Sequence, residues 1–109
     1  MSRPARLHIA IGVSDLQKSR KFYANYLRAE PTRVAPDQVD WILDCPPVNF
    51  SIFYNPDKPL GPEHIGLDFA RDQLAREEDR LGVKDAHILD PDGIRVEVFS
   101  SDPEKSSKA

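Results

Sequence analysis

The chain has 109 residues, of which 39% are hydrophobic and 30% are charged, as is typical of one globular domain and not of a disordered chain. Its formal net charge of −3 excludes the basic footprint that nucleic acid or an anionic membrane surface requires, so we expect neither partner. No apolar run approaches the roughly 18 residues of a membrane span, the N-terminal residues lack the apolar stretch of a signal peptide, and a single cysteine excludes an internal disulfide, so we expect a cytoplasmic protein.

The first half of the chain predicts a strand, a helix and three strands. Residues 6–13 alternate apolar side chains with small or polar ones, which is typical of a strand. Ser14 as an N-cap, followed by apolar residues at helical spacing to about Arg28, predicts a helix. Three further strands, separated by turns that contain proline, are expected at 30–34, 39–44 and 49–54.

The second half repeats this order with fewer residues. Its predicted strand, helix and two strands lie at 63–69, 72–81, 85–89 and 94–99. Only eight residues separate the helix from the turn before the last strand, which leaves room for one strand and not two. We therefore expect a single domain over 1–109, with module one at 6–54, a linker at 55–62, module two at 63–100 and a polar tail at 101–109.

Three of these strands each carry one side chain that can bind a metal, namely His8, His64 and Glu97. Side chains alternate between the two faces of a strand, and each of the three lies opposite an aliphatic stripe, an agreement that chance would produce about one time in eight. Two imidazoles and a carboxylate that leave open positions suit a divalent metal. The alternative is a pair of hydrogen-bonded strand histidines, with Glu97 in a salt bridge to Arg95.

Three segments, taken together in order and spacing, resemble the vicinal-oxygen-chelate superfamily, which is the glyoxalase/bleomycin-resistance/extradiol dioxygenase fold. The segments are Val13-Ser14-Asp15-Leu16 with Phe22-Tyr23, His64-Ile65-Gly66-Leu67, and Asp90-Pro91-Asp92-Gly93 followed by Glu97. The resemblance implies an α+β fold in which two βαβββ-type modules form an incomplete barrel around a metal. In this chain the second module would be shorter by about one strand.

By matching positions, the resemblance implies that His8, His64 and Glu97 bind the metal and that Glu97 is also catalytic. Many members of the superfamily carry a fourth ligand, a Glu, where this chain has Asn49, so we expect three ligands. That set resembles the extradiol dioxygenases, which use ferrous iron, and the fosfomycin-resistance type. Fe²⁺ is favoured, with Mn²⁺, Ni²⁺ or Zn²⁺ as alternatives. The expected substrate contacts are Asn49, Ser51, Phe53 and Arg95, and the alternative for Asn49, Ser51 and Phe53 is ordinary strand packing.

Residues 29–55 look like the cadmium-induced and organoarsenical-lyase subgroup, whose members carry a vicinal cysteine pair that this chain lacks. The expected function is a metal-dependent lyase or dioxygenase acting on a small molecule that chelates the metal through neighbouring oxygens. The alternative is a non-catalytic module of the same fold that sequesters a small molecule or a metal. A homodimer is expected, because a shortened second module leaves a sheet edge exposed.

Overall fold

The structure is a computed structural model that describes residues 2–83 and 85–103. The elements within these residues are β1 (Arg6–Gly12), α1 (Leu16–Leu27), β2 (Arg33–Val34), β3 (Gln38–Asp44), β4 (Pro47–Phe53), β5 (Gly61–Asp68), α2 (Arg71–Leu81), β6 (His87–Leu89) and β7 (Arg95–Phe99). The fold class is α+β, as expected. Neither helix in the described part of the chain has the length or the apolar run needed to cross a bilayer.

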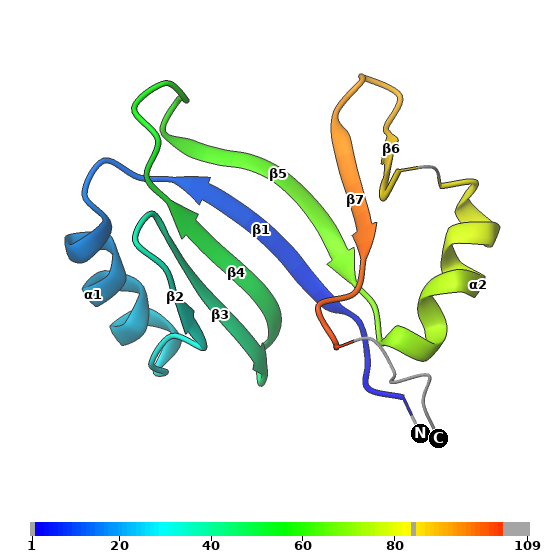
Figure 1. Ribbon diagram of the computed structural model, residues 1–109, viewed down its shortest axis with the longest axis horizontal. Helices are drawn as coiled ribbons and strands as arrows, with labels where there is room; N and C mark the ends of the chain where they lie inside the picture. The colour runs from blue at the N-terminus through cyan, green and yellow to red at the C-terminus, as the bar shows by residue number, and fades with distance from the viewer. Residues whose placement is uncertain (1, 84, 104–109) are drawn as a thin grey trace.

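The described strands form one mixed sheet in the order β2-β3-β4-β1-β5-β7-β6 (Figure 1). The central strands β1 and β5 run antiparallel, β4 is parallel to β1, and β7 is parallel to β5. The sheet stays open, so the incomplete barrel implied by the resemblance is not closed here. Between α2 and β7, the described residues hold one strand, β6, which forms an edge of the sheet.

Several element boundaries differ from the sequence prediction, each for a local reason. The N-cap of α1 is Asp15 and not Ser14, because the Asp15 carboxylate accepts a hydrogen bond from the Lys18 amide. Strand β6 begins at His87, since Asp85 and Ala86 have positive φ angles that an extended strand excludes.

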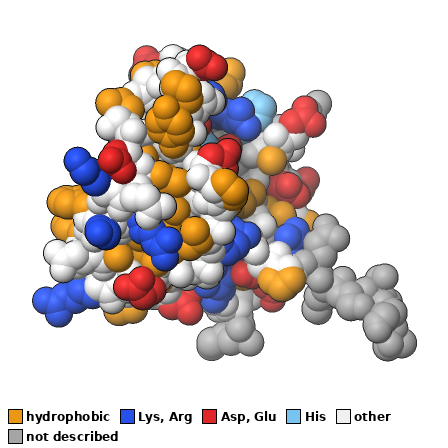
Figure 2. Space-filling view, turned by 60° about the vertical axis from the view of Figure 1, so that its left-hand side comes forward, with side chains coloured by type: hydrophobic (Ala, Val, Ile, Leu, Met, Phe, Trp, Pro, Cys, Tyr) orange, Lys and Arg blue, Asp and Glu red, His pale blue; other side chains and the backbone are white. Residues whose placement is uncertain are grey.

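The main apolar core lies between α1 and the strands β3 and β4. Val39, Trp41 and Ile52 are fully buried there, and the ring of Tyr23 packs against this cluster from the helix. The indole nitrogen of Trp41 donates a hydrogen bond to the Ala29 carbonyl at 2.9 Å, which satisfies its polar atom inside the core. On the side that carries α1, hydrophobic side chains lie among Lys and Arg side chains (Figure 2).

The polar face of the central strands is the more buried one, and the aliphatic face is open. His8 is 8% exposed, whereas Leu7 on the opposite face of β1 is 46% exposed. On β5, Asp68 is fully buried and Leu67 is exposed. The reason is the position of the helices: α1 packs on β3 and β4 and α2 packs on β7, so neither covers β1 and β5 (Figure 1). We call the face that carries His8 the ligand face.

The two ends of the described chain are tied together at the sheet. Arg3 forms ion pairs with Asp68 at 2.9 Å and with Asp102 at 3.1 Å. Ser101 donates its amide and its hydroxyl to Asp68. The first residues of the expected polar tail are thus held in place, while residues 104–109 of that tail lie outside the described residues.

Candidate metal centre

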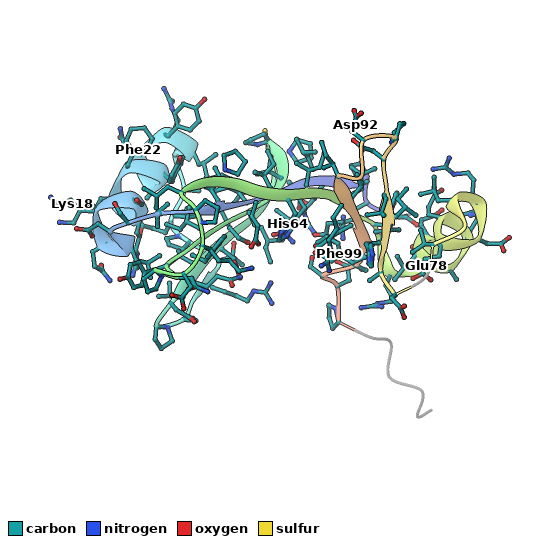
Figure 3. The ribbon with its side chains drawn as sticks, turned by 90° about the horizontal axis from the view of Figure 1, so that it is seen from above. Lys18, Phe22, His64, Glu78, Asp92 and Phe99 are labelled. Carbon is teal, nitrogen blue, oxygen red and sulfur yellow. The ribbon has the colours of Figure 1, made fainter. Side chains whose placement is uncertain are left out.

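The side chains predicted to bind a metal meet at one point on the ligand face. His8 lies on β1, His64 on β5 and Glu97 on β7, and one donor atom of each lies within 4.8 Å of the others. The two histidine Nε2 atoms are 3.1 Å apart, and Glu97 Oε1 lies 3.7 Å from Nε2 of His8 and 3.4 Å from that of His64. His64 and Phe99 lie on the same side of the sheet (Figure 3), and the Phe99 ring packs edge-on against His8 at 5.0 Å between centroids.

These separations match the size of a divalent ion. Nitrogen and oxygen ligands bind such ions at about 2.0–2.2 Å, which places neighbouring donor atoms roughly 3.0–3.6 Å apart. The three measured distances define a point that lies about 2.0 Å from each donor atom. Two imidazoles and one carboxylate are also a donor set that iron, manganese, nickel and zinc accept. The residues therefore fit a metal of the expected kind.

Hydrogen bonds on the other side of each ring decide which nitrogen carries the proton. Nδ1 of His8 lies 2.9 Å from the Asn49 carbonyl oxygen, and Nδ1 of His64 lies 3.0 Å from Oε1 of Glu63. A carbonyl and an ionised carboxylate can only accept, so each Nδ1 donates, and the neutral form of each ring then presents a lone pair at Nε2. With both rings in this form, two lone pairs and the Glu97 carboxylate face one another, an arrangement that a bound cation stabilises.

Glu63 reaches the His64 ring because β5 contains a bulge. Ala10 pairs with His64 and the next residue, Ile11, pairs with Pro62, so Glu63 has no register partner on β1. A bulge sets two successive residues opposite one and re-aims their side chains. The backbone irregularity therefore allows Glu63 to lie beside His64 instead of on the opposite face of the sheet.

Lys58 completes this chain of contacts from the segment 54–60 that joins β4 to β5, here called the 54–60 loop. Its ammonium group donates to Oε2 of Glu63, whose other oxygen accepts from His64. The hydrogen bond from Lys58 holds the pKa of the Glu63 carboxyl below its ordinary value of 4.5; partial burial opposes this effect and the His64 contact adds to it. Glu63 is therefore an ionised acceptor for the His64 ring at neutral pH.

Gly66 lets β5 and β7 approach where the ligands meet. It is the register partner of both His8 and Glu97, so it lies between two of the ligands. A Cβ at this position would lie 2.6 Å from the Glu97 carbonyl oxygen and 2.8 Å from the Glu97 Cβ. Real Cβ atoms essentially never come that close, so glycine is required here for space.

Asn49 supports His8 and connects it to a buried carboxylate. Besides accepting from His8 at its carbonyl, Asn49 donates its side-chain amide to Asp68 at 3.1 Å. Burial raises the pKa of the Asp68 carboxyl, but hydrogen bonds from Ser101 and Asn49 and the charge of Arg3 outweigh this, and the net pKa lies below the ordinary 3.8. The ligand face is therefore held by a fully hydrogen-bonded, ionised network.

A cavity of about 260 Å³ opens beside the two histidines. Its walls come from β1, β3, β4, β5 and the 54–60 loop, and they include His8, Gln38, Ser51, Phe53, Lys58 and His64. Pockets for drug-sized ligands usually span roughly 300–1,000 Å³, so this cavity, which is slightly below that range, suits a molecule smaller than a typical drug. Glu97 lies outside its lining, so the cavity faces the ligand triad from the histidine side.

The predicted substrate contacts occupy different positions around this site. Ser51 and Phe53 line the cavity together with the histidines. Asn49 is buried beside His8, with its side chain hydrogen-bonded, and it lies outside the lining. Arg95 lies next to Glu97, 3.4 Å from Oε2, and its side chain is more than half exposed. Substrate contact by these four residues stays a prediction.

Sequence reasoning missed Lys58 and Glu63. Strict alternation assigns Glu63 to the face opposite His64, and no motif marks a lysine in a linker rich in proline. One signal was available, because Pro62 falls inside a strand, and proline in a strand is confined to edges, first residues or bulges. The predicted linker at 55–62 contained Pro62 and the predicted strand began at Glu63, so this signal was not used.

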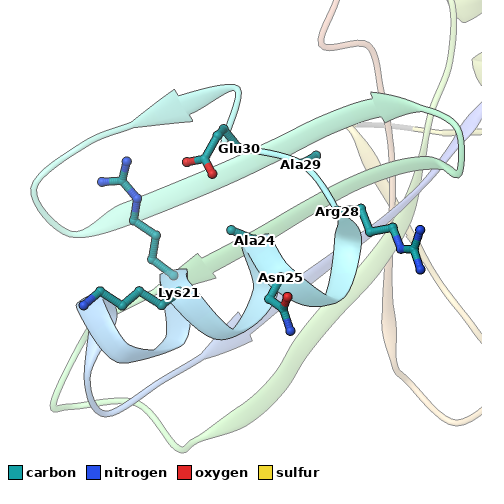
Figure 4. Close-up of a pocket in the computed structure, with 7 residues that line it drawn as sticks. Lys21, Ala24, Asn25, Arg28, Ala29 and Glu30 are labelled. Carbon is teal, nitrogen blue, oxygen red and sulfur yellow. The ribbon is translucent and has the colours of Figure 1, made fainter.

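A larger hollow of about 590 Å³ lies at the C-terminal part of α1, away from the triad. Figure 4 shows Lys21 and Arg28 pointing out of it in different directions. Both side chains are exposed, as is Glu30 on the rim, so their charges are solvated and do not converge on one point. Size alone therefore does not make this hollow the functional site, and the smaller cavity beside the histidines is the better candidate.

Comparison with known proteins finds a local sequence match. No family model matches the chain. A stretch of 45 residues, which is 41% of this chain, is 38% identical to the trivalent organoarsenical cleaving enzyme of Bacillus sp. (strain MD1). The match spans only 28% of that relative's length.

Among solved structures, the fold is similar to that of the NAD-dependent benzaldehyde dehydrogenase from Legionella pneumophila. The TM-score is 0.51, and the match covers 83% of this chain and 94% of the other. The sequence identity is 16%, so this similarity concerns the fold alone. Taken together, the chain has an α+β fold with a metal-sized triad and a local similarity to an organoarsenical-cleaving enzyme.

Proposed function

We propose that this protein is a metal-dependent enzyme, of the lyase or dioxygenase type, that acts on a small molecule with two neighbouring oxygen atoms. The ligands would be His8, His64 and Glu97. Fe²⁺ is the favoured ion, and Mn²⁺, Ni²⁺ and Zn²⁺ are the alternatives.

One observation carries this proposal, namely the hydrogen-bond acceptor that faces Nδ1 of each histidine. The neutral tautomer with its proton on Nδ1 therefore suits both rings, and in that tautomer both Nε2 atoms present their lone pairs toward Glu97. A merely structural pair of strand histidines would be expected to give at least one of these nitrogens a donor. Second-sphere acceptors that orient the ring in this way are typical of metal-binding histidines.

A metal bound at the triad would supply Lewis acidity toward the oxygens of the substrate. The chain's own residues would bind and orient that substrate from the cavity side. Phe53 offers an apolar ring and Ser51 offers a hydroxyl donor, both on β4 beside the histidines. Glu97 would act from the opposite side of the triad, held by Arg95 at its second oxygen.

The name of the matching relative makes a trivalent organoarsenical one candidate substrate. The only cysteine in this sequence is Cys45, which is exposed in the turn between β3 and β4. A single cysteine cannot supply a vicinal cysteine pair. Trivalent arsenic binds soft thiolates best, and the triad and cavity offer nitrogen and oxygen donors instead. We therefore favour an oxygen-chelating substrate.

The test is a reaction screen on protein loaded separately with Fe²⁺, Mn²⁺, Ni²⁺ and Zn²⁺. The panel would contain catechols, hemithioacetals and trivalent organoarsenicals, with Glu97→Gln as the site variant. Glu30→Gln is the matched control, because Glu30 is exposed at the other end of the molecule. We expect turnover that depends on the metal, survives in the control and is lost in Glu97→Gln.

A different result would favour the non-catalytic alternative. If panel compounds bind to the metal-free protein with equal affinity in wild type and Glu97→Gln, and none is turned over with any metal, the enzyme proposal is wrong. The chain would then be a module that sequesters small molecules.

A further inference from the structure

We infer that Glu63 and Lys58 form a positioning pair that holds His64 in its metal-binding orientation and so sets the metal affinity of the site. This inference rests on the proposed metal centre, and it goes beyond that proposal by naming two residues outside the triad.

Glu63 contacts the imidazole ring of His64 directly, and the carboxylate of Glu63 supplies the contacting atom. Its Oε1 lies 3.0 Å from Nδ1 of His64, on the side of the ring away from the triad. Of the two histidines, His8 has a backbone carbonyl in this role, which a side-chain substitution cannot remove. The orientation of His64 therefore depends on a side chain, and that side chain is held in reach by the bulge in β5.

Glu63 is itself held in place by Lys58. Without such a contact, a carboxylate near the surface is free to rotate. Lys58 donates to its second oxygen, so both oxygens of Glu63 are engaged, one by the loop and one by the ligand. An oxygen that is fixed in this way loses less conformational freedom when His64 binds a metal.

Hydrogen bonds within the 54–60 loop fix its conformation and therefore the position of Lys58. The Asn55 side chain accepts from the Asp57 amide at 2.9 Å, and the Lys58 amide donates to the Asn55 carbonyl at 3.0 Å. The loop also contacts β1, since a Cβ at Gly12 would lie 2.7 Å from the Pro59 carbonyl oxygen. The loop thus has a defined path from the central strand to the ligand.

The experiment titrates the purified protein with Co²⁺, whose visible absorption reports both affinity and ligand geometry. Glu63→Ala should weaken Co²⁺ binding about 10–100-fold, the usual effect of removing a second-sphere partner. Glu63→Gln should lose less than Glu63→Ala, since an amide oxygen still accepts from Nδ1. Lys58→Met should weaken binding in the same direction, by less than Glu63→Ala.

Two controls separate positioning from general damage. Glu30→Gln and Lys21→Met remove the same charges from the far hollow and should bind Co²⁺ like wild type. The thermal unfolding midpoint of the metal-free protein should also be unchanged in Glu63→Gln, because exposed ion pairs add little stability. A fall in that midpoint that parallels the loss of affinity would show a structural role and overturn the inference.

The inference and the proposed function fail in different ways. If wild type does not bind Co²⁺, the metal centre itself is wrong. If wild type binds Co²⁺ and His64→Ala does not, the centre stands, and Co²⁺ affinity within about twofold of wild type in either Glu63→Ala or Lys58→Met overturns the positioning pair.

Discussion

Replacing Gly66 with alanine is the sharpest perturbation of the ligand face, because it adds one methyl group between two ligands. The new Cβ would lie 2.6 Å from the Glu97 carbonyl oxygen, whereas ordinary contacts begin at 3.4 Å. Relief of the overlap therefore requires β5 and β7 to separate by about 0.8 Å at this point. Metal–ligand distances tolerate only about 0.2 Å, so Glu97 cannot follow its strand and keep its place in the triad.

Two effects of Gly66→Ala oppose each other in stability. Overpacking costs about 1–3 kcal/mol, while a less flexible unfolded chain returns about 0.4–1 kcal/mol. We expect the free energy of unfolding to fall by about 1–2 kcal/mol, measured by urea denaturation without metal. Metal affinity should fall at least about tenfold, because the displaced ligand is part of the triad.

Gly82→Ala is the matched control for this prediction. Gly82 caps α2 with a φ of 69° and has open space around its Cβ position, so alanine there costs backbone strain alone. It should lose about 1 kcal/mol and bind metal like wild type. If Gly66→Ala matches wild type in both unfolding free energy and metal affinity, the close approach of β5 and β7 at Glu97 is wrong.

Substitutions at three further positions test the contacts that hold the sheet and α1 in place. Asp68→Asn should cost about 3 kcal/mol at neutral pH, because it removes the fully buried carboxylate from its ion pair with Arg3, which keeps Asp102 as a partner. The pKa of Asp68 in the folded protein lies below the ordinary 3.8, so its contribution to stability is present above pH 3.8 and is lost as the pH falls through the folded pKa. Urea denaturation at a series of pH values should therefore show the unfolding free energies of wild type and Asp68→Asn converging in acid. A difference in unfolding free energy that does not change with pH would contradict this prediction. Trp41→Phe should lower the free energy of unfolding by about 2 kcal/mol in the same assay, because side-chain volume is lost and the Ala29 carbonyl loses its donor. A change under about 0.5 kcal/mol would contradict the assignment of Trp41 to the core. Asp15→Ala should lose about 1 kcal/mol and Asp15→Asn nearly nothing, while equal losses would argue against a capping role.

The positions of the triad could be predicted from the sequence because alternation along a strand is a local property. His8 lies between Leu7 and Ile9 in sequence, so any strand there puts the histidine opposite the aliphatic residues. The same reasoning holds for Glu97 between Val96 and Val98.

The parts that sequence reasoning could not supply depend on contacts between distant segments. Alternation does not say which face is buried; the helices cover β3, β4 and β7, so Leu7 and Leu67 stay exposed on an apolar face. Nor does it reveal a bulge, since Glu63 changes face only through the pairing of β5 with β1. Lys58 enters the site for the same reason, through a loop whose path the two strands determine.

The most direct test of the metal centre is the metal stoichiometry of the purified protein after loading and removal of free ions. We expect about one tightly bound divalent ion per chain, absent in His8→Ala and in His64→Ala and retained in Glu30→Gln. Substoichiometric metal in wild type, or an amount that neither histidine substitution changes, would show that His8, His64 and Glu97 do not form a metal centre.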